Sequence, residues 1–110
     1  MYNLYSSPEK HGLTTVGEIE WGYGDYSFDL TVVWKTADGK FLYAEDSGCS
    51  CPSPFDETAL VDLRPVESLA EFKVYLETQR LANISGAWTS PTVEQDIAQL
   101  LESMHLQGAR

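Results

Sequence analysis

The sequence has few basic residues and no long apolar run, and both absences limit what the chain can bind. Seven lysines and arginines stand against 17 aspartates and glutamates in 110 residues, which gives a formal net charge of −10. Because phosphate binding depends on basic side chains that release counterions, this balance disfavours direct binding to DNA or RNA. Anionic membrane surfaces repel such a chain too. No apolar stretch approaches the roughly 20 residues that span a bilayer, so we expect no membrane association.

The chain also has little cysteine and no recognisable secretion signal. Residues 1–12 contain neither the basic nor the apolar region of a signal peptide, so we expect a cytoplasmic location. Only one residue separates the two cysteines, Cys49 and Cys51, and this spacing does not suit the geometry of a disulfide. Thiols in the cytoplasm also remain reduced. The sequence therefore does not predict a disulfide-stabilised fold.

What is present is enough apolar material for one core. Hydrophobic residues make up 43% of the 110 residues, and this length leaves no room for a second core of useful size. We therefore expect residues 1–110 to form a single small α+β domain, with residues 1–13 as an irregular N-terminal arm.

The first half of the sequence has the two-residue period of β-strands. Three segments alternate apolar and polar residues: 14–23, 26–35 and 41–46. Asp38 and Gly39 supply the positive φ angles of a hairpin turn between the second and third segments. The pattern predicts a three-stranded antiparallel meander over residues 14–46.

The polar positions of these predicted strands carry acidic residues. Glu18 and Glu20 alternate with apolar residues in the first strand, and Asp29 does so in the second. We therefore expect one face of the sheet to be open and mainly negative, and to exclude nucleic acid. An acidic surface that imitates a nucleic acid is an alternative, because it would attract the same basic partners.

The second half of the sequence has the 3.6-residue period of helices. The run from Ser68 to Glu71 matches a capping box and predicts a helix over residues 68–82. Ser90 and Pro91 are a favoured start for a second helix over residues 91–105. Its apolar stripe consists of Val93, Ile97, Leu100, Leu101 and Met104. Because a three-stranded sheet needs a cover, we expect both helices to pack on one of its faces.

The segment between the last predicted strand and the first helix has an unusual composition. It is rich in serine, and its two prolines restrict the unbound chain and so lower the ordering cost of binding. Connections of this kind often carry function on a rigid scaffold. We predict that the segment is a binding surface. The residues predicted to form it are Asp46, Ser47, Gly48, Cys49, Ser50, Cys51, Pro52, Ser53, Pro54 and Phe55. In a competing structural account, Phe55 pins the segment to the core.

The two cysteines also raise the question of chemistry in this segment. Thiolates at Cys49 and Cys51 can both ligate zinc, and Asp46, His11 or His105 could complete the set. A zinc site usually has a second cysteine or histidine pair, which this sequence lacks. A nucleophilic thiol needs a base or cation nearby, whereas this neighbourhood is acidic. We predict a non-enzymatic protein without catalytic residues, metal or cofactor. A metal-binding or thiol-dependent module centred on these cysteines is the alternative.

Residues 11–60 resemble an uncharacterised family of small proteins carried by actinobacteriophages and their hosts. The resemblance rests on YSFDL at 26–30, VW at 33–34, DG at 38–39 and DSGCSCPSPF at 46–55. It implies an accessory protein of phage type and supplies no catalytic residues. We therefore expect a small acidic protein that acts in the bacterial cytoplasm through protein–protein interaction with a host or phage protein.

Overall fold

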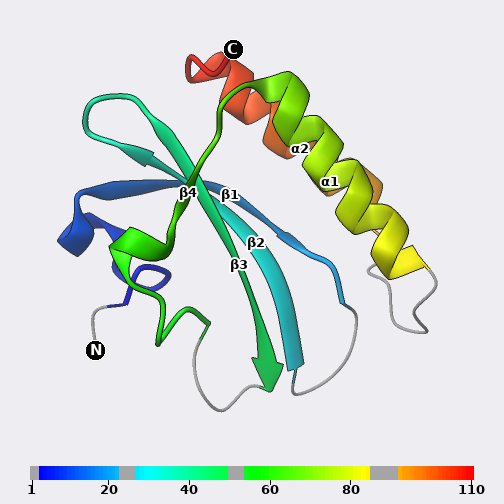
Figure 1. Ribbon diagram of the computed structural model, residues 1–110, viewed down its shortest axis with the longest axis horizontal. Helices are drawn as coiled ribbons and strands as arrows, with labels where there is room; N and C mark the ends of the chain where they lie inside the picture. The colour runs from blue at the N-terminus through cyan, green and yellow to red at the C-terminus, as the bar shows by residue number, and fades with distance from the viewer. Residues whose placement is uncertain (1–2, 23–26, 50–53, 85–91) are drawn as a thin grey trace.

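The structure, a computed structural model, describes residues 3–22, 27–49, 54–84 and 92–110. Its sheet has four antiparallel strands in the order β1-β2-β3-β4. The strands are β1 (Leu13–Glu20), β2 (Ser27–Thr36), β3 (Phe41–Cys49) and β4 (Arg64–Pro65). Two helices follow, α1 (Leu69–Ile84) and α2 (Val93–Leu106), and both lie on one face of the sheet (Figure 1). The predicted α+β class, the antiparallel meander and the pair of helices are confirmed.

The sheet has four strands, so the predicted number of three is wrong. The additional strand, β4, consists of Arg64 and Pro65, which pair with Tyr43 and Leu42 of β3. A strand of two residues is too short to show a two-residue period, and proline is typical of sheet edges. The sequence pattern therefore carried no signal for it.

β3 is longer than predicted and does not end at residue 46. Asp46, Ser47, Gly48 and Cys49 continue the ladder with β2 and belong to a strand rather than to a loop. The Phe28 ring lies over Gly48, because a Cβ atom at Gly48 would be 3.4 Å from Phe28 Cζ. The aromatic ring thus covers a glycine that would otherwise leave the strand without a side-chain contact.

The helices begin and end close to the predicted 68–82 and 91–105. Ser68 Oγ accepts a hydrogen bond from the backbone N–H of Glu71 at 3.1 Å, which is the serine half of the predicted capping box. The predicted cap at Ser90 and Pro91 lies outside the described residues. Neither described helix combines the length and apolarity needed to cross a bilayer.

The helices bury one face of the sheet in a first core. It contains Ile19, Trp21, Val33, Phe41, Phe72, Leu76, Val93, Ile97, Leu100, Met104 and Ala109. α2 packs closely against β1 at Gly17, where a Cβ atom would be 2.9 Å from Leu100 Cδ1. The missing side chain at Gly17 therefore allows the helix to lie directly on the strand.

The opposite face of the sheet is covered as well. A second core contains Leu4, Leu13, Leu30, Val32, Trp34, Ala44, Phe55 and Leu63. The N-terminal arm contributes Leu4 and includes the 3-10 helix η1 (Pro8–His11). Residues 54–63, here called the covering segment, contribute Phe55 and Leu63 and end in the 3-10 helix η2 (Leu60–Asp62). The sheet thus lies between the helices and an irregular layer.

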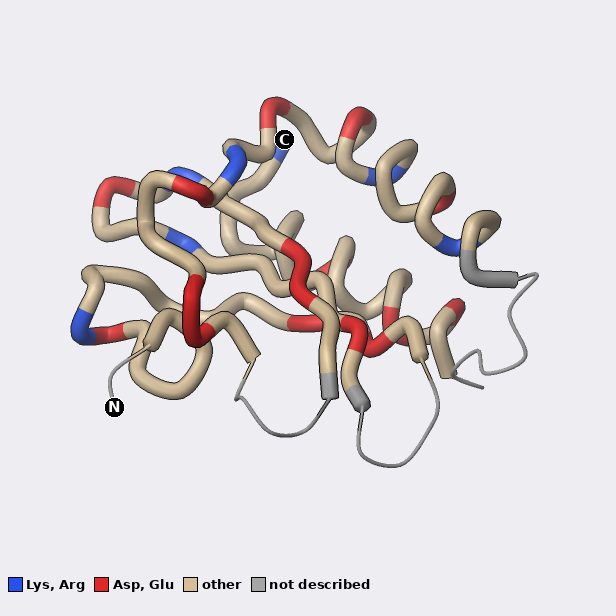
Figure 2. Tube along the Cα trace, turned by 60° about the horizontal axis from the view of Figure 1, so that its bottom comes forward, with Lys and Arg blue, Asp and Glu red and all other residues tan. Residues whose placement is uncertain are grey.

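The prediction of one open, mainly negative face is wrong. In the ladder, Glu18 pairs with Val32 and Glu20 pairs with Leu30, so these acids share the face of the second core. Asp29, one position from Leu30 on the same strand, points to the helix face. The acidic residues are spread over several elements (Figure 2). The register sets the acidic positions of β1 beside the apolar positions of β2, which periodicity within each strand could not reveal.

Candidate functional site

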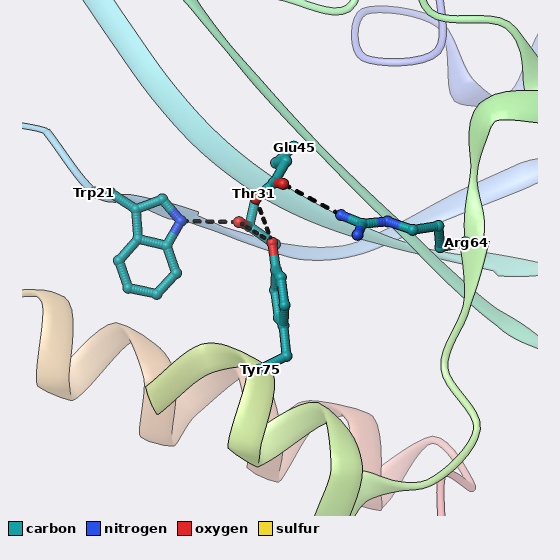
Figure 3. A network of polar contacts seen from close by, with 5 residues as sticks. All are labelled: Trp21, Thr31, Glu45, Arg64 and Tyr75. Carbon is teal, nitrogen blue, oxygen red and sulfur yellow. Dashed lines mark hydrogen bonds and ion pairs between the residues drawn. The ribbon is translucent and has the colours of Figure 1, made fainter. Parts of the chain in front are cut away.

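A chain of polar contacts connects the sheet to α1, and it begins at Thr31. Thr31 is fully buried on β2, and its Oγ1 accepts a hydrogen bond from Trp21 Nε1 at 2.8 Å. The same hydroxyl lies 3.2 Å from the Tyr75 hydroxyl of α1 (Figure 3). These contacts satisfy polar groups that would be costly to bury alone, and they fix the position of α1 over the sheet.

The chain of contacts continues to the edge of the sheet. Tyr75 donates a hydrogen bond to Glu45 Oε2 at 2.6 Å, and Arg64 Nη2 lies 3.3 Å from Glu45 Oε1. The Arg64 guanidinium also lies over the Tyr43 ring, 4.6 Å from its centroid. Glu45 is therefore held from two sides, by a phenol and by a cation that an aromatic face stabilises.

The ionisation of Tyr75 follows from this environment. Burial raises the pKa of the Tyr75 phenol above its ordinary value, and the hydrogen bond to Glu45 raises it further. Tyr75 therefore carries its proton at neutral pH and acts as a hydrogen-bond donor. This arrangement orients the Glu45 carboxylate and does not suit Tyr75 for a role as base or nucleophile.

Glu45 and Arg64 also line a hollow of about 430 Å³ beside β3. One wall is β3 from Ala44 to Gly48 together with Phe28 of β2, and the other is formed by the covering segment and Arg64. The carboxylates that line it are those of Glu45, Asp46, Asp56, Glu57 and Asp62. Arg64 supplies the guanidinium among these lining residues. We call this feature the acidic hollow.

Hydrogen bonds to the backbone hold the carboxylates of the acidic hollow in place. Asp46 Oδ2 accepts from the N–H of Phe55 at 2.8 Å, and Asp46 Oδ1 accepts from the N–H of Ser47 at 3.0 Å. Asp62 Oδ2 accepts from the N–H of Ala59 at 2.8 Å. A carboxylate that accepts backbone N–H groups is fixed in orientation.

The N-terminal arm reaches the same wall. Asn3 Nδ2 donates to Asp56 Oδ1 at 2.5 Å and lies 3.3 Å from the carbonyl of Pro54. The Asn3 side-chain oxygen in turn accepts from the backbone N–H of Ser6 at 2.7 Å. One asparagine thus joins the arm to the covering segment.

Phe55 anchors the covering segment to the second core. Its side chain is fully buried, and its ring meets Trp34 edge-on at 5.4 Å and stacks on Tyr5 at 5.9 Å between centroids. Its φ angle of 65° is in the left-handed region, so the turn carries backbone strain that the buried ring offsets. Phe55, which we predicted to belong to the binding surface, therefore holds the surface from beneath.

The structure brings only part of the predicted binding segment to the acidic hollow. Asp46, Ser47 and Gly48 line it from β3. The Cys49 side chain and residues 50–53 lie outside the described residues, so the question of a metal at the two cysteines lies there too. Among the described residues, no three histidine, cysteine or carboxylate side chains are grouped to hold a metal ion.

Five charged residues of the acidic hollow lie outside the predicted segment 46–55: Glu45, Asp56, Glu57, Asp62 and Arg64. Asp56 and Glu57 were visible as a carboxylate pair, but a chain with this many acids produces such pairs by chance. Arg64 offered one usable signal, because it is among only seven basic residues in the chain.

A half-buried carboxylate lies on the helix face, and it yields a prediction about pH. Burial raises the pKa of Asp29, and the charge of Glu45 raises it further. The ionised form of Asp29 therefore destabilises the fold above its folded pKa, and this penalty disappears below the ordinary value of 3.8. We expect Asp29→Asn to increase the free energy of unfolding at pH 7 by about 0.5 kcal/mol, after allowance for solvent screening. At pH 3 it should have no effect.

Urea unfolding at both pH values tests this expectation. Asp38→Asn is the matched control, because a hydrogen bond from the Thr36 hydroxyl and the charge of Lys40 lower the pKa of Asp38. This variant should lose stability at pH 7, opposite in sign to Asp29→Asn. Equal gains for Asp29→Asn at pH 3 and pH 7 would show that its charge is not the cause.

The fold and the acidic hollow define a small α+β domain with a charged recess at one edge of its sheet. Over residues 2–105 the chain matches DUF7574, a domain of unknown function, and it belongs to this family. No curated protein and no solved structure matches it.

Proposed function

We propose that this chain is a small, non-enzymatic accessory protein of phage type that binds a basic segment of a host or phage protein in the bacterial cytoplasm. The acidic hollow carries the proposal, because a recess with five carboxylates and one guanidinium has a large excess of negative charge. The phage context rests on the resemblance of residues 11–60.

The electrostatics favour lysine or arginine as the ligand groups. Arg64 pairs with Glu45, so one cation faces five carboxylates in the hollow, and the resulting negative field attracts cations from a partner. Complementary charge speeds association and selects the partner more than it adds affinity. A volume of about 430 Å³ suits a few side chains or a short peptide.

The hydrogen bonds around the hollow support binding over acid–base chemistry. Asp46 and Asp62 direct oxygens to backbone N–H groups, and Glu45 accepts from Tyr75 and Arg64. Groups held in this way keep their positions. Fixed negative charge is what recognition of a cation requires.

The proposal predicts that charge inside the hollow matters more than charge elsewhere. Fluorescence anisotropy would measure the affinity of the protein for a labelled peptide at about 0.15 M salt. The peptide has capped ends and about seven residues, in which valine alternates with lysine. The triple variant Asp56→Asn, Glu57→Gln and Asp62→Asn should bind about tenfold more weakly or worse than the wild type.

The control carries the same change of net charge outside the hollow. It combines Glu9→Gln, Glu67→Gln and Glu102→Gln, all at exposed positions. It should lose less than about threefold. Equal losses for the two triple variants, or no binding by the wild type, would overturn the proposal.

Two further measurements separate the proposal from the alternatives raised by the sequence. Stoichiometric zinc in elemental analysis of the purified protein would favour a metal-binding module at Cys49 and Cys51. Displacement of the protein from a basic partner by duplex DNA, in a salt-sensitive way, would favour imitation of a nucleic acid.

A further inference from the structure

We infer that the partner segment binds as an added β-strand along the free edge of β3, inside the acidic hollow. This inference rests on the proposed function and adds the conformation of the ligand. An extended segment with alternate lysines or arginines would extend the sheet by one strand in line with β4.

The edge exists because β4 is much shorter than β3. β4 pairs with β3 only at Leu42 and Tyr43, whereas β3 continues to Cys49. Within the described part of the chain, no strand pairs with this second half of β3 on the β4 side. Figure 1 shows β3 running well past β4 toward its arrowhead.

The backbone groups of alternate β3 residues point toward the β4 side of the strand. Val66 N–H donates to the Phe41 carbonyl at 2.9 Å, so Phe41 directs its backbone groups toward β4. The backbone N–H and C=O groups of successive residues in a strand point alternately to the two adjacent strands. Those of Tyr43, Glu45 and Ser47 therefore point the same way as those of Phe41. Tyr43 is paired with β4, whereas Glu45 and Ser47 lie beyond it. Glu45 and Ser47 therefore lie at ladder positions for a further strand, where the Ser47 N–H would exchange its present acceptor, Asp46 Oδ1, for a carbonyl of the added strand.

The acidic hollow provides room at this place. Adjacent strands lie about 4.8 Å apart, and four or five extended residues span about 13–17 Å. The hollow runs along β3 from Ala44 to Gly48, and the covering segment forms its far wall. An added strand would therefore bond to β3 on one side and pass the carboxylates of Asp56 and Glu57 on the other.

The charge of the hollow decides which occupant fits. A second copy of this chain would bring a second set of five carboxylates against the first, and like charges face to face are unfavourable. A basic segment would instead place cations beside these groups. The proposal therefore commits to a lysine- or arginine-bearing peptide in extended conformation.

Amide hydrogen exchange in the wild-type protein tests the backbone part of the inference directly. Saturation with the valine–lysine peptide should slow exchange of the Glu45 N–H about tenfold or more, while the N–H of exposed Val74 on α1 should not change. A different result would overturn strand addition and leave the proposed function intact. In that result the wild type binds the peptide and the triple variant binds it more weakly, but exchange of the Glu45 N–H is unchanged.

Two substitutions of one residue give an independent test. Ser47→Pro removes an N–H that points away from β2 and donates to Asp46 Oδ1, so the ladder with β2 stays complete and Asp46 keeps its hydrogen bond from Phe55. Ser47→Ala keeps this N–H and measures how much the serine side chain contributes to peptide affinity. We expect Ser47→Pro to weaken peptide binding about tenfold or more beyond the loss from Ser47→Ala. Equal affinities for the two variants would overturn strand addition.

Two further outcomes would also overturn the inference. If the wild type binds no peptide, the proposed function fails and strand addition fails with it. If the Glu45 N–H is protected without peptide, and protection grows with protein concentration in parallel with a dimer in sedimentation, the edge belongs to a second copy of the chain. That result would overturn the peptide as occupant.

Discussion

Phe55→Ala is expected to lower the free energy of unfolding by about 3–5 kcal/mol, the usual range for loss of a fully buried phenylalanine. The ring is completely buried against Trp34 and Tyr5, so alanine leaves a cavity beneath the covering segment. Alanine at a φ of 65° keeps the backbone strain and loses the packing that offsets it.

Urea unfolding monitored by tryptophan fluorescence measures this loss. Leu60→Ala is the matched control, because Leu60 lies on the same segment with 48% of its surface exposed. It should cost less than about 0.5 kcal/mol. If Phe55→Ala lowers the free energy of unfolding by no more than Leu60→Ala does, the covering segment does not hold the second core together.

Asp46→Ala is expected to cost about 2 kcal/mol. Asp46 joins β3 to the covering segment, since its carboxylate accepts from Ser47 and from Phe55. The variant leaves the part-buried N–H of Phe55 without this acceptor, at the point where the chain makes its strained turn. Asp46→Asn keeps one acceptor oxygen and should cost about half as much.

The same urea titration compares these variants with Glu57→Gln. Glu57 lines the acidic hollow too, but it is exposed, and its substitution should change stability by less than about 0.5 kcal/mol. Equal costs for Asp46→Ala and Asp46→Asn would locate the effect in the charge. A cost for Asp46→Ala no larger than that of Glu57→Gln would refute the role of Asp46 as a clamp.

The parts of the fold that could be predicted are those determined by short-range pattern. The period of two over β2 is broken at Val33 alone, and the hairpin at Asp38 and Gly39 forces the next strand to return beside it. Ser68 caps α1 as expected, because the capping bond spans only three residues. In each case the residues that decide the structure lie close together in the sequence.

The parts that escaped prediction depend on contacts between distant residues. The covering of the second face joins Leu4 to Trp34 and Phe55, and no local pattern links these three. The register of β1 against β2 depends on a shift between Thr15 and Gly17, which places the acids of β1 on the opposite side from Asp29.

The candidate site was half visible for the same reason. Asp46 and Ser47 drew attention by the composition of their segment, and they do line the acidic hollow. Glu57, Asp62 and Arg64 reach it only because β4 folds back onto β3. A charge in a sequence says little about a site until the chain brings a second wall beside it.

The contacts of Asn3 set an order of events during synthesis of the chain. Asn3 bonds to the carbonyl of Pro54 and to Asp56, which lie 51 and 53 positions later in the sequence. Pairing across so long an interval requires a long loop to close, which slows folding. Asn3 therefore waits for residues 54–56 to be synthesised, and the recess beside β3 acquires its far wall only after all three strands of the meander have been made.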